Sequence, residues 1–205
     1  MNLDFSDIKI LLIGDFMIDH YIIGTSERIS PEAPVPVIIP EREYSIPGGT
    51  GNVALNLRAL GAKVDCLGEV GDDEWGKKLV SILNDNGANT DDIVLGHHKK
   101  TIVKERIYLR EANRSWKPPR PGRITMKEIQ LARIDRDSIY TQFFSLGKFN
   151  NYDLDQYDAC IFSDYNKGTI RNLNYDTCPQ LANTSSLVFV DPKKSDFSLL
   201  KRSFQ

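Results

Sequence analysis

The stretch PGGTGNVALNLRALGAKVDCLG, residues 47–68, carries the pattern that predicts the fold. Its glycine-rich start leads into residues 52–60, where apolar side chains recur at helical spacing. Gly61 then follows as a helix C-cap, and residues 63–68 have the composition of a strand. The stretch therefore predicts a loop, a helix and a strand in immediate succession.

The same alternation extends in both directions from this stretch. Residues 8–13, IKILLI, form a continuous apolar run before Gly-Asp, which is typical of a buried parallel strand. Residues 74–86 predict an amphipathic helix that ends at a glycine, and residues 158–162 and 187–190 predict two more buried strands. Strands that alternate with helices predict an α/β fold with a parallel sheet and right-handed crossovers.

Other segments predict a second, smaller sheet. Residues 33–39, APVPVII, have prolines at alternate positions, which favours an edge strand. Residues 101–109 and 131–136 alternate apolar and charged side chains, as antiparallel strands with one solvated face do. We expect these pieces to form a small β-sheet lid, made of segments at about 20–46 and 99–137.

Residues 110–130, REANRSWKPPRPGRITMKEIQ, interrupt this second sheet as an insertion. Their prolines and basic side chains favour a solvated loop. A proline-rich segment that docks a partner is the alternative.

Composition excludes several classes of protein. The 205 residues carry 26 Lys and Arg against 28 Asp and Glu, a net charge of −2, so a nucleic-acid partner is not expected. No apolar run reaches the roughly 20 residues that cross a bilayer, and the acidic N-terminus is unlike a signal peptide. We therefore expect no membrane partner.

Cysteine and histidine usage points to the cytoplasm and away from a metal site. The three cysteines, Cys66, Cys160 and Cys178, are odd in number and far apart, which argues against a disulfide framework and for a reducing compartment. His97 and His98 are adjacent in a polar loop and read as solvated side chains, so no metal ligands are predicted.

Polar clusters follow the predicted strands, where ligands bind in open α/β sheets. Asp15 and Asp19 follow the first strand; they could accept hydrogen bonds from sugar hydroxyls, or serve as a turn residue and a helix N-cap. No Gly-x-Gly-x-x-Gly follows this strand, so a nicotinamide or flavin site lacks its phosphate-binding turn.

The other clusters lie at the same predicted edge. The Pro47–Asn52 segment brings glycines and the start of a helix, which favour oxygen-rich ligands, although Asn52 could simply be an N-cap. Asp164 follows the strand at 158–162, and Lys193 follows the strand at 187–190. Their joint position predicts one binding site at this edge.

Eight motifs, taken in chain order, resemble those of the ribokinase-like (PfkB) carbohydrate kinases. They are GDFMIDHY, RISPEAPVPVI, PGGTGNVALNLRALGA, GEVGDDEWG, TIVKERI, RIDRD, SDYNKG and DPKKSDF. Residues 29–37 are most similar to the heptose-7-phosphate kinases of lipopolysaccharide-core precursor synthesis. The resemblance covers the chain except residues 110–130. It implies a ribokinase-like parallel-sheet sandwich, with residues 1–205 forming part of one kinase domain.

The resemblance also implies residue roles. Sugar hydroxyls would be bound by Asp19, Gly48, Gly49 and Asn52, with Asp164 in the same pocket. Lys104 and Arg106 would approach the sugar and its phosphate, and Lys193 would lie toward the nucleotide. In such kinases Mg-ATP gives its γ-phosphoryl to a sugar hydroxyl, here the anomeric position of heptose 7-phosphate, and the lid often forms a homodimer interface.

Members of this family have further motifs after Asp-Pro-Lys, including the catalytic base, and the sequence contains no match to them before Gln205. From the resemblance we expect the C-terminal third to be missing, with it the main nucleotide site, and we expect no useful kinase activity from this chain alone. A non-catalytic sugar-phosphate-binding pseudokinase or partner subunit stays open, as does an interaction protein that docks through the lid and residues 110–130.

Overall fold

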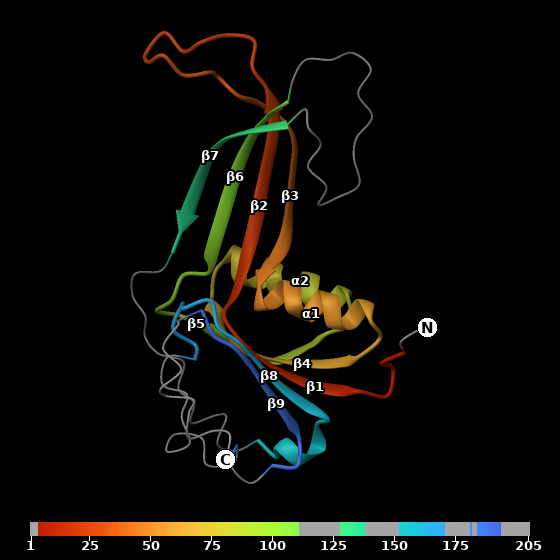
Figure 1. The fold of residues 1–205 in the computed structure, drawn as a ribbon. Coiled ribbons are helices and arrows are strands. Elements are labelled where there is room, and N and C mark those ends of the chain that lie inside the picture. The colour runs from red at the N-terminus through yellow and green to blue at the C-terminus, as the bar shows by residue number, and fades with distance from the viewer. Residues whose placement is uncertain (1–3, 111–127, 138–151, 171–180, 182–183, 194–205) are drawn as a thin grey trace. The chain divides into compact units, whose positions relative to one another are not determined.

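This computed structural model describes residues 4–110, 128–137, 152–170, 181 and 184–193. The chain forms two compact units. The first comprises residues 1–18, 47–102 and 137–205, and the second comprises residues 19–46 and 103–136. Each unit has a sheet of its own (Figure 1).

The first unit contains a five-stranded parallel sheet. Its order is β5-β4-β1-β8-β9. The strands are β1 (Lys9–Gly14), β4 (Lys63–Gly71), β5 (Asn89–Gly96), β8 (Ala159–Ser163) and β9 (Leu187–Asp191). The parallel α/β sheet predicted from the sequence is therefore confirmed, and β5 is a strand that the sequence pattern missed.

Two helices cover one face of this sheet (Figure 1). They are α1 (Thr50–Ala59) and α2 (Glu74–Asp85). Each is followed by a glycine with a left-handed backbone, Gly61 (φ 98°) and Gly87 (φ 78°), as the two predicted C-caps require. Both crossovers, β1 to β4 and β4 to β5, place their helix on this same face, as right-handed connections between parallel strands do.

The details of α1 differ from the prediction. The helix begins at Thr50, after an N-cap at Gly49, so Asn52 is not its N-cap. The side buried on the sheet is formed by Thr50, Gly51 and Ala54, while Leu60 is 49% exposed. A Cβ at Gly51 would lie 2.8 Å from Pro47, and the Thr50 hydroxyl donates to the Ser163 carbonyl of β8 at 3.1 Å, so larger side chains would not fit there.

The core of the first unit gathers around β1 and β8. Leu11, Ile13, Leu67, Cys160 and Phe162 are fully enclosed. The prediction of a buried strand at 187–190 is wrong in one respect: β9 pairs with β8, but Leu187 and Phe189 are 64% and 54% exposed. An apolar run predicts a strand, whereas its burial depends on what lies against its faces.

The second unit contains a four-stranded sheet. Its order is β3-β2-β6-β7. The strands are β2 (Phe16–Thr25), β3 (Ile39–Gly49), β6 (Ile102–Arg110) and β7 (Glu128–Arg136). The predicted antiparallel pairing of 101–109 with 131–136 is confirmed by the register of β6 and β7. Only Glu128 of β7 is buried.

Two sequence predictions for this sheet are wrong. Residues 33–38 are not an edge strand: they contribute an isolated bridge, Ile29 to Pro36, and the strand begins at Ile39. Prolines remove ladder N–H groups, so regular pairing starts where they end. Asp19 is not a helix N-cap but lies inside β2.

The predicted insertion at 110–130 is shorter than expected, because Arg110 belongs to β6 and residues 128–130 belong to β7. Residues 111–127, where both of its interpretations fall, lie outside the described residues. Among the described helices, none is long and apolar enough to cross a membrane.

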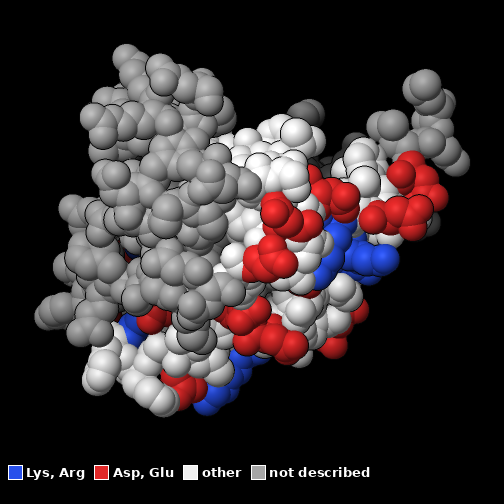
Figure 2. Space-filling model, turned by 90° about the horizontal axis from the view of Figure 1, so that it is seen from below, with Lys and Arg blue, Asp and Glu red and all other residues white. Residues whose placement is uncertain are grey.

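The described surface carries mixed charge. On the face in Figure 2, acidic and basic side chains stand beside one another, and no continuous basic area is visible on its described part. This agrees with the near-neutral composition of the chain.

Candidate functional site

Asp15, between β1 and β2, is 2% exposed. Its carboxylate accepts three backbone hydrogen bonds from the loop after β8: from the N–H of Tyr165 at 2.9 Å, of Lys167 at 3.0 Å and of Thr169 at 3.0 Å. Asp15 is thus a turn residue, which was one of its two predicted roles. Both of its carboxylate oxygens already accept hydrogen bonds from backbone N–H groups.

The glycine-rich loop before α1 packs directly on this turn. Gly48 is buried, and Gly49 has a positive φ of 54°. A Cβ at Gly49 would lie 2.7 Å from the Asp15 carbonyl oxygen, which receives the Thr50 N–H at 3.1 Å. Only glycine combines this backbone conformation with so close an approach.

The first turn of α1 has no side-chain cap, although its Thr50 N–H donates to the Asp15 carbonyl. Its N-cap makes no side-chain hydrogen bond, and no acidic residue lies in the first turn. Asn52, on that turn, is exposed. Helix N-termini present unpaired N–H groups and positive potential, and an Asn side chain adds a donor and an acceptor.

Asp164 begins the loop after β8 and is half-buried. Its N–H donates to the Asp191 carbonyl at 3.0 Å, and its Oδ1 accepts from the Asn166 N–H at 2.6 Å. Its Oδ2 makes no hydrogen bond within the described part of the chain. In the same loop, Lys167 pairs with Asp137 at 2.5 Å.

Lys193 lies two residues beyond β9 and is exposed. It follows the same strand as Asp191, to which the Asp164 N–H is bonded. Parallel pairing therefore places Lys193 at the same edge of the sheet as the loop of Asp164.

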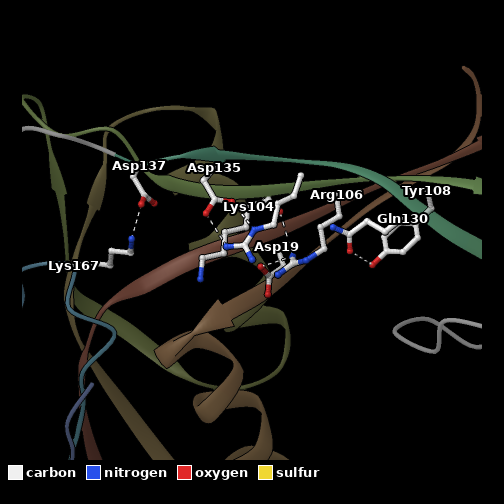
Figure 3. Close-up of polar contacts among 9 residues, drawn as sticks. Asp19, Lys104, Arg106, Tyr108, Gln130, Asp135, Asp137 and Lys167 are labelled. Carbon is white, nitrogen blue, oxygen red and sulfur yellow. Dashed lines mark hydrogen bonds and ion pairs between the residues drawn. The ribbon is translucent and has the colours of Figure 1, made fainter. Parts of the chain in front are cut away.

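In the second unit, Asp19 of β2 forms an ion pair with Arg106 of β6 (Figure 3). The Arg106 Nη1 is 2.7 Å from the Asp19 Oδ1, and the two side chains are 18% and 19% exposed. The Arg106 guanidinium also lies over the Tyr21 ring at 5.3 Å. Burial raises the pKa of Tyr21, although the nearby Arg106 charge opposes this.

Lys104 and Arg106 stand two residues apart on β6, so they project from the same face of the strand. Arg106 also donates to the Lys104 carbonyl at 3.4 Å. Within the described residues, the Lys104 ammonium has no ion-pair partner. Two cations side by side, one already oriented by a carboxylate, are an arrangement that suits a phosphate group.

The predicted site residues therefore fall into two groups. Gly48, Gly49, Asn52, Asp164 and Lys193 belong to the first unit, at the carboxyl edge of its sheet, and Asp19, Lys104 and Arg106 belong to the second. The bonds of Asp15 tie the glycine loop to the loop of Asp164.

Sequence reasoning missed Lys99, which follows β5. Its side chain is 10% exposed, and its Nζ donates to the Glu69 carbonyl at 3.1 Å and lies 3.8 Å from the Glu69 carboxylate. Burial lowers the pKa of Lys99, against the opposing effect of Glu69 and Asp15. A lysine in a run of charged loop residues gives no signal of burial.

In the described part of the chain, no group of His, Cys, Asp and Glu is arranged to hold a metal ion. The His97 side chain is 80% exposed and its Nδ1 lies 3.0 Å from Asp72. Cys66 and Cys160 are free and buried, and burial raises their pKa values to about 12 and about 11.

Comparison with known proteins gives the family of this chain. Residues 7–116, more than half of it, match the pfkB family carbohydrate kinase. The chain belongs to the pfkB family of carbohydrate kinases. Among curated relatives, it is 41% identical over 194 residues to the bifunctional protein HldE of Sulfurimonas denitrificans. That alignment covers 93% of this chain and 37% of the relative, so the chain spans little more than a third of it.

Solved structures agree with this carbohydrate kinase fold. A ribokinase of Arabidopsis thaliana, complexed with ribose and ATP, aligns with a TM-score of 0.58 at 12% identity, over 90% of this chain and 53% of that one. A ribokinase of Cryptococcus neoformans in complex with ADP aligns with a TM-score of 0.55 at 16% identity, over 96% and 53%. The ribokinase-like fold expected from the motifs is confirmed.

Proposed function

We propose that this pfkB chain binds the sugar phosphate for a kinase that phosphorylates heptose 7-phosphate to the 1,7-bisphosphate. The bifunctional protein HldE relatives and the Ile-Ser-Pro-Glu-Ala-Pro-Val-Pro-Val segment support this substrate. In this proposal the product serves lipopolysaccharide-core precursor synthesis, and the reaction takes place in the cytoplasm, where ATP is supplied.

The observation that carries the proposal is the Asp19–Arg106 pair beside Lys104. A guanidinium held by a carboxylate is already oriented, so little side-chain freedom is lost when it binds a second oxyanion. The Lys104 ammonium, which has no ion pair among the described residues, adds a second cation for the phosphate. Asp19 retains an oxygen that can accept a hydrogen bond from a sugar hydroxyl.

In the first unit, Gly48, Gly49 and Asn52 would bind sugar hydroxyls through the first turn of α1, and Asp164 would accept from another. Hydroxyl groups are well matched by backbone N–H donors, an amide and a carboxylate together.

The transfer step is proposed for a whole kinase rather than for these residues alone, since the chain spans 37% of its HldE relative. Mg-ATP would supply the phosphoryl group. Lys193, which is exposed beyond β9, would contact a nucleotide phosphate. We also propose that the four-stranded sheet serves as a lid, whose outer strand β7 pairs two copies into a homodimer.

Calorimetric titration with heptose 7-phosphate and with the unphosphorylated heptose tests this function. We expect Arg106→Gln and Lys104→Gln each to weaken binding of the sugar phosphate about tenfold or more, because each removes a charge-assisted contact to the phosphate. Binding of the unphosphorylated sugar should change much less. Lys78→Gln, which removes an exposed cation from α2, is the matched control.

A wild-type chain that binds neither sugar would overturn the proposal. Equal losses of affinity for both sugars would show that Lys104 and Arg106 do not contact the phosphate. An ATP-turnover assay on the chain then separates a kinase from the non-catalytic alternative, which binds the sugar phosphate without turnover.

A further inference from the structure

Asp15 uses all of its polar groups to hold other segments of the first unit. Its N–H donates to the Ser163 carbonyl at 3.3 Å, and its carbonyl accepts from the Thr50 N–H at 3.1 Å. Its carboxylate receives the N–H groups of Tyr165, Lys167 and Thr169. One buried residue thus joins the end of β1, the start of α1 and the loop after β8.

The loop after β8 is shaped around this carboxylate. Asn166 has a φ of 58° and Gly168 a φ of 114°, so left-handed residues alternate with the residues that donate. Backbone of this kind turns its N–H groups inward and forms a concavity for an anion. Here the anion is the Asp15 side chain, which belongs to the protein itself.

Nearby side chains do not substitute for Asp15. The Ser163 and Thr169 hydroxyls are buried, at 1% and 3% exposed, and neither has a hydrogen-bond partner within the described residues. The Thr50 hydroxyl donates to the Ser163 carbonyl at 3.1 Å, which fixes α1 to β8 but does not involve residues 165–169. Asp164 accepts the Asn166 N–H alone, whereas the Asp15 carboxylate gathers the amides of Tyr165, Lys167 and Thr169.

We infer that Asp15 is a positioning residue that holds the glycine loop and the Asp164 loop in the geometry needed for binding sugar hydroxyls. It does not touch the sugar, because its oxygens are bonded to the loop amides. The residues it arranges are Gly49, Asn52 and Asp164. The sugar ligand in this inference rests on the proposed function. The contacts of Asp15 do not depend on that function.

The test uses the full chain with Asp15→Asn, which keeps the size of the side chain and replaces one acceptor oxygen with a donor. Hydrogen exchange should speed up at the amides of Tyr165, Lys167 and Thr169. Affinity for heptose 7-phosphate should fall about tenfold. Affinity for inorganic phosphate, a probe for Lys104 and Arg106, should stay within about twofold, a split that general destabilisation would not produce.

Asp155→Asn is the matched control. Its Oδ1 also accepts three hydrogen bonds, from the Thr184 hydroxyl and from the N–H and hydroxyl of Ser185, but it holds a different segment. We expect faster exchange at Ser185 and unchanged affinity for both probes.

Each outcome has a definite meaning. Unchanged exchange at the loop amides in Asp15→Asn overturns the inference, and so does faster exchange with undiminished affinity for the sugar phosphate. Equal losses for sugar phosphate and inorganic phosphate also overturn it, since Asp15 would then act on overall stability. A wild-type chain that binds neither probe overturns the proposed function, while the exchange result still decides whether Asp15 holds the loop. If a variant fails to fold, Asp15→Ser, which keeps one acceptor oxygen, replaces it in the same measurements.

Discussion

The two units hold their buried acidic residues in different ways. In the first unit, the Asp15 carboxylate is surrounded by backbone N–H groups, which the fold fixes in place. In the second, Glu105 is paired with the half-exposed Arg136 at 3.2 Å, and the Arg42 guanidinium lies 3.9 Å from Glu128. Backbone donors are preorganised, whereas paired side chains lose rotamer freedom when they meet. We therefore expect the contacts of Asp15 to contribute more to stability than the ion pairs of Glu105 and Glu128.

The largest expected difference concerns the core. Leu12 of β1 is fully buried, so Leu12→Ala should lower the free energy of unfolding by about 2–5 kcal/mol. Ile129 of β7 is 53% exposed, and Ile129→Ala should change it by about 0.5 kcal/mol or less. Urea denaturation followed by circular dichroism measures both. Similar losses for the two variants would show that β7 is covered in solution.

The next effect concerns Asp73, the N-cap of α2. Its carboxylate accepts from the Gly76 N–H, the Thr101 N–H and the Thr101 hydroxyl, at 2.7–2.9 Å. Asp73→Ala should cost about 1–2 kcal/mol in the free energy of unfolding at neutral pH. Asp85→Asn, at an exposed carboxylate of the same helix, is the control.

The contribution of Asp73 should also depend on pH. Burial raises the pKa of Asp73, but the hydrogen bonds from Thr101 and Gly76 outweigh it, so the pKa is lowered on folding. A lowered pKa means that the stabilisation is complete above the unfolded-state value near about 4 and is lost as the pH falls through the folded-state value. The difference between wild type and Asp73→Asn should therefore shrink below about pH 4. A difference that grows on acidification would contradict this sign.

The smallest effect concerns the paired side chains of the second unit. The Arg136 side chain is 56% exposed, so Arg136→Gln should cost less than about 1 kcal/mol, although it leaves Glu105 without this partner. The loss should be smaller still in about 1 M salt, because exposed charge pairs are screened. Urea denaturation at two salt concentrations measures it. A salt-independent loss of several kcal/mol would contradict the expectation that this ion pair is weak and screened by salt.

Local patterns were sufficient to predict the elements of the first unit. Continuous apolar runs gave β1 and β8, and helical periodicity with a terminal glycine gave α1 and α2. These signals are local because they depend on side-chain spacing and on glycine's access to positive φ. The strand β5, NTDDIVLG, was missed because it is polar at its start and only partly buried.

The candidate site was predictable in part. The motifs placed polar residues beyond parallel strands, and the structure finds Gly49 and Asp164 on segments joined through Asp15. Local sequence could not tell that Asp15 and Asp19, four residues apart, would differ in their partners, because those partners are 150 and 87 residues away along the chain.

Residue patterns were enough to indicate the family, the alternation of strands and helices, and the residue types available for sugar and phosphate. The folded arrangement was needed to show that the Asp15 carboxylate accepts backbone amides, that Asp19 is paired with Arg106, and that Leu187 and Phe189 lie exposed on β9. The physical reason is that propensity and periodicity act between near neighbours in sequence. Burial and hydrogen-bond partnership depend on which distant segments the fold brings together.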